Sequence, residues 1–204
     1  TGVSGGTLAL VGVKVADDGV VYAANLAAAT STLKIYRWDS DATTDDPLNV
    51  FTFAGVTTRY GDTLDLRGSG ASTEIIISGS GGTKVALFTT TDGTNFNAEL
   101  DEFLVLTNYM KEIPIPAGTS AGDFGKGIAF DGTNNAFYAK KDGTTPIRYI
   151  TYDPVALSAT NIVSIAVDSR MVGLDIGSTN GFRVAGGVLY GSGTTLTPDQ
   201  HRAR

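Results

Sequence analysis

Two aspartates, a lysine and an arginine are the residues of this sequence whose types and spacing could do acid–base chemistry. Asp65 and Asp175 stand at the same place in two copies of an internal repeat, and Lys14 stands there in another. Arg67 follows Asp65 by two residues, so in a strand both side chains share one face. Paired carboxylates beside a cation can hydrolyse glycosides. The alternative is that these groups form ion pairs that satisfy the inner strand edges.

Four carboxylates lie close together between two expected strands. They are Asp39, Asp41, Asp45 and Asp46. Such an oxygen-rich stretch suits Ca²⁺, but it lacks the Gly and the Glu of an EF-hand loop. The pattern predicts either a weak surface calcium site or an ordinary polar loop. The sequence indicates no other cofactor.

Three aromatic residues stand near turn signals. Tyr60, Phe96 and Tyr109 could stack on sugar rings if their loops expose them. Aromatic residues at strand spacing more often pack sheet against sheet. Both interpretations remain open from the residues alone.

Several chemistries are excluded by residues that the sequence lacks. The chain has one His, His201, and no Cys. A Ser-His-Asp triad, a His-based metal triad and a Cys nucleophile are therefore not expected. The formal net charge of −6 opposes binding to nucleic acid. No apolar run approaches the roughly 18 residues that a membrane span needs.

The start of the chain and its composition bear on location. The sequence begins at Thr1 without an initiator Met, as a mature secreted product or a piece of a longer precursor would. Acidic, Cys-free chains rich in Thr, Gly and Asp are common among bacterial surface proteins. We therefore expect an extracellular or cell-surface protein.

The apolar segments are short, β-branched or aromatic, and often alternating, which is typical of strands. Asp-Gly pairs at 18–19, 92–93, 131–132 and 142–143 mark tight turns between them. Residues 98–110 come closest to a helical pattern and are expected to hold at most one turn. The predicted fold class is all-β.

The strands form an internal repeat of four strands. Copies span about 8–54, 59–107, 121–167 and, in part, 172–193, within a single domain of residues 1–204. The expected strands are 10–16, 19–25, 32–38 and 48–54, then 62–67, 73–78, 84–90 and 102–107, then 126–131, 135–140, 146–152 and 161–167. Repeats of this length favour a β-propeller or propeller-like array of four-stranded blades, with a β-sandwich as the alternative.

The first strand of each copy carries two apolar residues at a spacing of two. These pairs are expected to face the core, because side chains two apart share a face. They are Val13 and Val15, Leu64 and Leu66, Ile128 and Phe130, and Leu174 and Ile176.

Segments 18–25, 34–39, 59–70 and 86–93 resemble a bacterial family that is known only as a domain of unknown function. The most specific of them is RYGDTLDLRGSG at 59–70. The resemblance spans about residues 8–180. It implies a secreted or surface-attached, propeller-like protein and brings no catalytic residues with it.

Just over three repeats leave strands without partners, since propellers usually have at least four blades. Residues 1–10 and 182–190 could close the ring within the chain; otherwise open edges pair with other copies. We therefore expect a non-catalytic extracellular structural or binding module that self-associates through open sheet edges. The alternative is a secreted carbohydrate-binding or carbohydrate-active protein, whose partner is an extracellular glycan.

Overall fold

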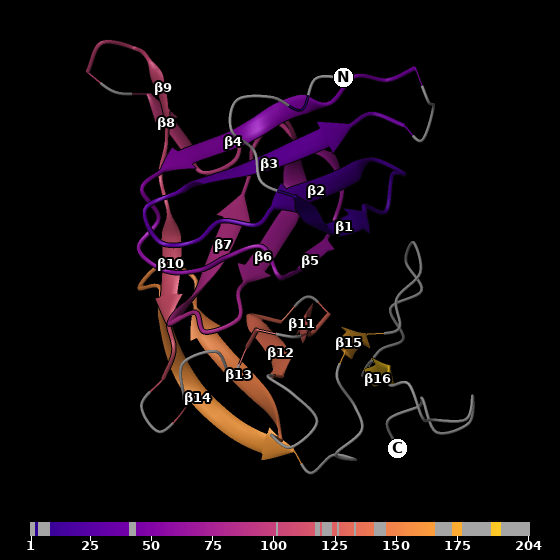
Figure 1. Cartoon of the computed structure of the whole chain (residues 1–204), viewed down its shortest axis with the longest axis vertical. Helices are drawn as coiled ribbons and strands as arrows, with labels where there is room; N and C mark the ends of the chain where they lie inside the picture. Colours follow the sequence, from indigo (N-terminus) through magenta and orange to yellow (C-terminus); the bar gives the residue numbers. More distant parts are fainter. Residues whose placement is uncertain are drawn as a thin grey trace.

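Antiparallel strands make up nearly all the regular structure of the chain (Figure 1). This computed structural model describes residues 3, 9–40, 44–100, 102–116, 119, 124–125, 127–132, 134–140, 146–165, 173–176 and 189–192. Within them lie three four-stranded sheets, two strand pairs and a single 3₁₀ turn at Gly70–Ser72. The predicted all-β class is confirmed. None of the described helical structure is long or apolar enough to span a membrane.

The first sheet follows chain order. Its strands are β1 (Leu10–Val15), β2 (Val21–Asn25), β3 (Thr32–Trp38) and β4 (Leu48–Ala54). Asp18 and Gly19 reverse the chain between the first two: Gly19 has φ +86°, and Asp18 Oδ1 accepts the Val20 N–H at 3.2 Å. The predicted strand bounds of this copy are confirmed to within two residues.

The second sheet departs from the prediction in its fourth strand. It has the order β10–β7–β6–β5, with β5 (Thr63–Arg67), β6 (Glu74–Ser78), β7 (Lys84–Thr89) and β10 (Lys111–Pro114). The prediction of 102–107 as the fourth strand is wrong. That region instead belongs to a separate hairpin of β8 (Ala98–Leu100) and β9 (Leu106–Asn108), which also replaces the expected helical turn.

Burial explains this error. Phe103 and Leu104 look like core residues in the sequence, but they are 77% and 78% exposed at the hairpin. Leu104 has φ +60°, a left-handed conformation that an extended strand does not contain. The true fourth strand places Ile113 opposite Val85, and both are buried.

The third sheet again follows chain order. Its strands are β11 (Gly127–Phe130), β12 (Ala136–Lys140), β13 (Ile147–Asp153) and β14 (Ser158–Ile165). Beyond it, β15 (Gly173–Ile176) pairs with β16 (Leu189–Ser192). The partial fourth copy thus has a second strand, β16, which overlaps the end of the expected 182–190 segment. Residues 182–188 of that segment lie outside the described chain.

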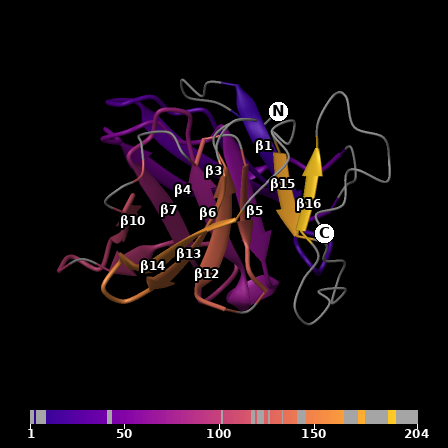
Figure 2. The same ribbon diagram turned by 90° about the horizontal axis from the view of Figure 1, so that it is seen from below.

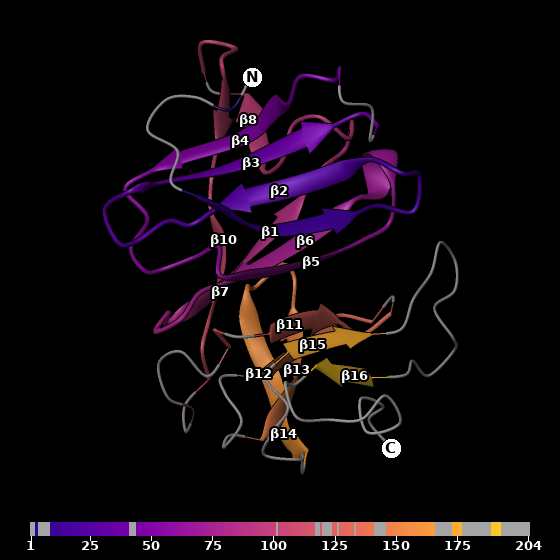
Figure 3. The same ribbon diagram turned by 45° about the vertical axis from the view of Figure 1, so that its right-hand side comes forward.

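Successive sheets pack face to face, with their first strands side by side. β5 contacts both β1 and β11, and β11 contacts β15 (Figure 3). One apolar cluster fills the space between the first and second sheets, and another fills the space between the second and third. The β15–β16 pair lies on the opposite side of the molecule from β10 and β14 (Figure 2).

The paired apolar residues of the first strands differ in burial from sheet to sheet. Leu64 and Leu66 face the first sheet, and Ile128 and Phe130 face the second; all four are buried. Val13 and Val15 are exposed instead, at 62% and 60%, so their expected core placement is wrong. In the second and third sheets, the face that corresponds to the one carrying Val13 and Val15 is covered by the preceding sheet.

Glycine is required at position 61, where two sheets approach closely. Gly61 has φ +91°, and a Cβ there would lie 2.1 Å from the backbone oxygen of Asn25. Gly19 has nearly the same φ, +86°, but nothing within 4 Å of an added Cβ. An alanine at either position would carry the cost of the left-handed backbone conformation, but only an alanine at position 61 would also clash with backbone atoms.

We predict that Gly19→Ala lowers the free energy of unfolding by about 1 kcal/mol, the cost of a left-handed conformation. Gly61→Ala has the same cost plus a clash with backbone atoms, for a loss of about 3 kcal/mol. Urea denaturation of both variants measures the difference. Equal losses would show that the chain just before β5 does not approach the end of β2 as closely as described.

Candidate functional site

Asp65 links the first strands of three sheets. It lies in the middle of β5 and is 5% exposed. Its Oδ1 is 3.4 Å from Lys14 Nζ of β1, and its Oδ2 accepts the Phe130 N–H of β11 at 2.8 Å. The sequence prediction that Lys14 and Asp65 lie near one another is met by this geometry.

Burial makes these partners necessary for Asp65. A buried carboxylate is costly unless it is paired and hydrogen-bonded. The side chain of Lys14 is 29% exposed, so its ammonium keeps contact with water while its stem runs along the sheet. An unpartnered Phe130 N–H would also cost free energy in this buried position. The carboxylate therefore satisfies two neighbouring strands at once.

Arg67 ties the same strand to the turn that follows β11. Its guanidinium forms an ion pair with Glu74 of β6 and lies 4.4 Å above the centre of the Phe130 ring. It also donates hydrogen bonds to the carbonyl oxygens of Gly132 at 2.9 Å and Asn134 at 2.7 Å. Five-donor guanidinium groups suit such multiple contacts, which a lysine could not reproduce.

The second carboxylate of the predicted catalytic pair is Asp175. It belongs to β15, which contacts β11, but its side chain lies outside the described part of the structure. A general acid or base must reach the substrate's proton. Because both Asp65 oxygens already bind protein groups in a buried place, the described geometry suits the ion-pair interpretation better than acid–base chemistry.

The predicted sugar-stacking aromatics do not share a surface. Tyr60 and Phe96 are both 0% exposed, so neither ring is available for stacking on a ligand. Phe96 packs edge-on against Tyr22 in the core, with ring centroids 5.7 Å apart. Tyr109 is partly exposed, and Lys111 Nζ lies 5.6 Å from its ring centroid.

Tyr60 belongs to a hydrogen-bonded network that its turn-like sequence context does not reveal. Its hydroxyl donates to Glu112 of β10 at 2.7 Å, and Lys84 of β7 forms an ion pair with the same carboxylate. Burial and the adjacent Glu112 raise the pKa of Tyr60 far above its usual range. The ring is therefore held as a neutral, structural hydrogen-bond donor.

The acidic stretch after β3 is only partly described. Asp39 forms an ion pair with Arg37, and Asp45 accepts a hydrogen bond from Ser40 at 2.6 Å. Asp41 lies outside the described residues. Asp46 is described, but within the described chain no three His, Asp or Glu side chains lie close enough together to hold a metal ion. The calcium site stays a prediction.

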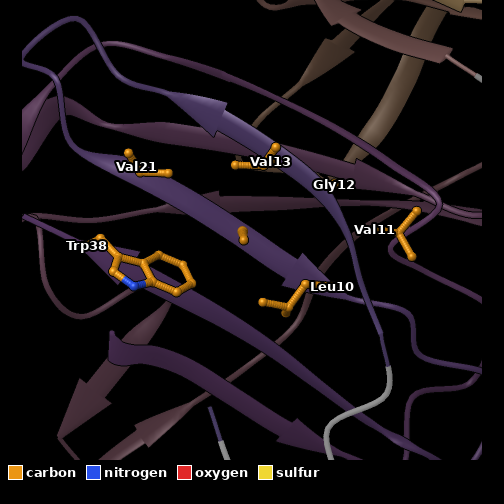
Figure 4. A pocket seen from close by; sticks show the side chains of 7 residues that line it. Leu10, Val11, Gly12, Val13, Val21 and Trp38 are labelled. Carbon is orange, nitrogen blue, oxygen red and sulfur yellow. The ribbon is translucent and has the colours of Figure 1, made fainter. Parts of the chain in front are cut away.

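An apolar hollow that the sequence did not suggest lies on the outer side of the first sheet (Figure 4). Its volume is about 300 Å³. The lining residues are Leu10, Val11, Gly12, Val13, Val21, Ala23 and Trp38. Most ligand pockets combine an apolar lining with a few convergent polar groups. The side chains that line this hollow are hydrophobic, which suits a protein surface better than a polar small molecule.

Comparison with solved structures relates the fold to proteins without an assigned function. A DUF4623 family protein from Bacteroides eggerthii aligns with a TM-score of 0.54 at 13% identity, over 90% of this chain and 42% of that one. The chain thus spans less than half the length of that protein. No protein-family model and no curated protein matches the sequence.

Two other solved structures align less well. One is a functionally unknown protein from Desulfotomaculum acetoxidans, with a TM-score of 0.39 at 14% identity over 94% of this chain and 64% of that one. The other is a luciferin-regenerating enzyme, with a TM-score of 0.34 at 12% identity over 92% and 70% of the two chains. At these TM-scores neither carries an argument. The similarity to the DUF4623 family protein is one of fold alone, and it is consistent with the uncharacterised bacterial family that the sequence resembles.

Removing the Asp65 carboxylate is predicted to destabilise the protein. Asp65→Ala leaves the Phe130 N–H without its acceptor and Lys14 without its partner. We expect a loss of about 2 kcal/mol in the free energy of unfolding, because Lys14 can turn toward water but the amide cannot.

Urea denaturation measures this loss, and Asp65→Asn is the matched control. It should cost less than Asp65→Ala, since its amide oxygen can still accept the Phe130 N–H. A stability unchanged within about 0.5 kcal/mol in Asp65→Ala would contradict a linking role for the carboxylate.

Proposed function

We propose that this chain is a non-catalytic extracellular structural module, built as a propeller-like array, that associates with copies of itself. The array is supported by three similar four-stranded sheets, whose first strands lie side by side. Propellers repeat such sheets around a central channel lined by their first strands. The extracellular location rests on the Cys-free, acidic composition.

The observation that carries self-association is the edge strand β14. It ends the third sheet and contains neither a charged residue nor a proline, and a bulge at Thr160 interrupts its pairing with β13. Edge strands of soluble proteins usually carry charges, prolines or bulges, because unpaired backbone groups invite another strand. Beyond its bulge, β14 keeps an uncharged regular stretch at residues 161–165, which suits strand pairing between copies.

We predict that a charge on this edge weakens association. Val163 of β14 is 45% exposed, so Val163→Lys places an ammonium on the strand without disturbing the core. The average mass by multi-angle light scattering should exceed that of a monomer for the wild type and fall toward it for the variant.

The matched control is Val155→Lys, at a turn position that is 91% exposed. It adds the same charge away from the edge and should leave the mass unchanged. A wild-type protein that stays monomeric at every concentration would overturn the proposed self-association.

The second candidate function is carbohydrate binding or hydrolysis, with Asp65 and Asp175 as carboxylates and Lys14 and Arg67 beside them. We expect no hydrolysis across a panel of polysaccharides, because Asp65 is buried and bound on both oxygens. Hydrolysis that disappears in a folded Asp65→Asn variant would replace the structural proposal with an enzymatic one.

A further inference from the structure

The face of the third sheet that points away from the second sheet carries two neighbouring tyrosines. Tyr138 of β12 and Tyr149 of β13 lie directly opposite one another. Both face away from the second sheet, because the adjacent Phe137 and Ile150 pack against it. The two ring centroids are 4.9 Å apart, the ring planes are tilted by 46°, and both side chains are partly exposed. We call these two rings the tyrosine pair.

The register of the sheets shows what occupies the same two positions in the second copy. Counted outward from the residue between the paired apolar positions of the first strand, Ile76 and Leu87 stand where the third sheet has Tyr138 and Tyr149. Both aliphatic side chains are buried beneath the third sheet. The third sheet thus replaces two covered aliphatic residues by aromatic residues with hydroxyl groups, which suits a face that stays in contact with water.

Polar groups lie beside the tyrosine pair. Asp131, in the turn after β11, accepts hydrogen bonds from the Tyr149 hydroxyl at 2.9 Å and from the Asn134 side chain at 3.1 Å. Burial raises the pKa of Tyr149 to about 12, and Asp131 contributes to this shift, so the hydroxyl stays protonated at neutral pH. Two residues after Tyr149 and on the same face, Thr151 Oγ1 lies 2.8 Å from Thr160 Oγ1.

The open part of this face extends from the tyrosine pair over β14. The strand β15 lies against β11 and β12, at the other side of the sheet from β14 (Figure 3). Val163 of β14 lies opposite Tyr149 and is 45% exposed. Asn161, two residues earlier on the same face, is exposed as well. A ligand can therefore approach the tyrosine pair from the side of β14.

The chemistry of this surface selects a neutral carbohydrate. A pyranose ring with equatorial hydroxyls has an apolar face of C–H groups that stacks on aromatic rings, and a polar edge that needs hydrogen-bond partners. Asp131 and Thr151 offer such partners beside the rings. The carboxylate and the formal net charge of −6 oppose an acidic polysaccharide. Another sheet on this face would bury the Asp131 carboxylate, at a cost that a hydroxylated ligand avoids.

We propose that the tyrosine pair, together with Asp131 and Thr151, is a binding platform for a neutral β-linked glycan whose sugar rings lie along the face toward β14. This inference goes beyond the proposed self-association and does not depend on it. It also differs from the second candidate function in its residues, because Asp65 takes no part. Since the platform is open, binding should be weak, with a dissociation constant on the order of 0.1 to 1 mM.

NMR titration of the isotope-labelled protein with cellohexaose, xylohexaose and mannohexaose tests the platform. At least one of these neutral β-1,4-linked hexasaccharides should bind in that range and shift amide signals of β12, β13 and β14. Tyr138→Ala and Tyr149→Ala should each weaken this binding at least about fivefold, because each removes a stacking ring. Tyr149→Phe keeps the ring and should weaken binding less than Tyr149→Ala.

Tyr109→Ala is the matched control, because Tyr109 is also partly exposed but lies between β9 and β10, away from the third sheet. It should bind as the wild type does, and circular dichroism establishes that each variant is folded. The proposal would be overturned if no hexasaccharide bound at about 10 mM, or if both alanine variants at the tyrosine pair bound as the wild type does.

Light scattering separates this proposal from self-association. Tyr149→Ala should keep the average mass of the wild type; a lower mass would assign the face to contact between copies and overturn the glycan platform. A wild-type monomer that binds a hexasaccharide through the tyrosine pair would overturn self-association alone.

Discussion

The carboxylate of Asp65 stands where the first strands of three sheets meet, and much of the arrangement depends on it. It binds Lys14 of β1 on one side and the backbone of Phe130 in β11 on the other. A buried charge in this position is stable only when both partners are in place. These two contacts link the three sheets at their first strands, while the apolar clusters between their faces supply most of the burial.

Face-to-face packing of repeated sheets leaves β14 as the last hydrogen-bonded strand of the third sheet, where β10 also contacts it. On the outer side of the first sheet the valines of β1 are exposed, whereas Ala23 and Tyr36 are buried. The strand β14 contains no charged residue. This uncharged edge is readily explained if the module functions in contact with other copies, which is why we favour assembly over catalysis.

Much of this fold could be predicted from the sequence, because Asp-Gly turns and alternating residues set the strands of the first copy. The fourth strand of the second copy could not be, since Phe103 and Leu104 are apolar but exposed. The alternation of side chains along β1 shows that Val13 and Val15 share a face, but it does not show whether another sheet covers that face. The partner of Asp65 in β11 is a backbone N–H, which no side-chain pattern can show.

Hydrogen exchange of the Phe130 amide tests most directly whether Asp65 holds the first strands together. In the wild type this amide should exchange as slowly as the best-protected amides of β5, because its bond to Asp65 breaks only when the sheets separate. In Asp65→Ala it should exchange much faster while β12 and β13 stay protected. Rapid exchange in the wild type would contradict the account.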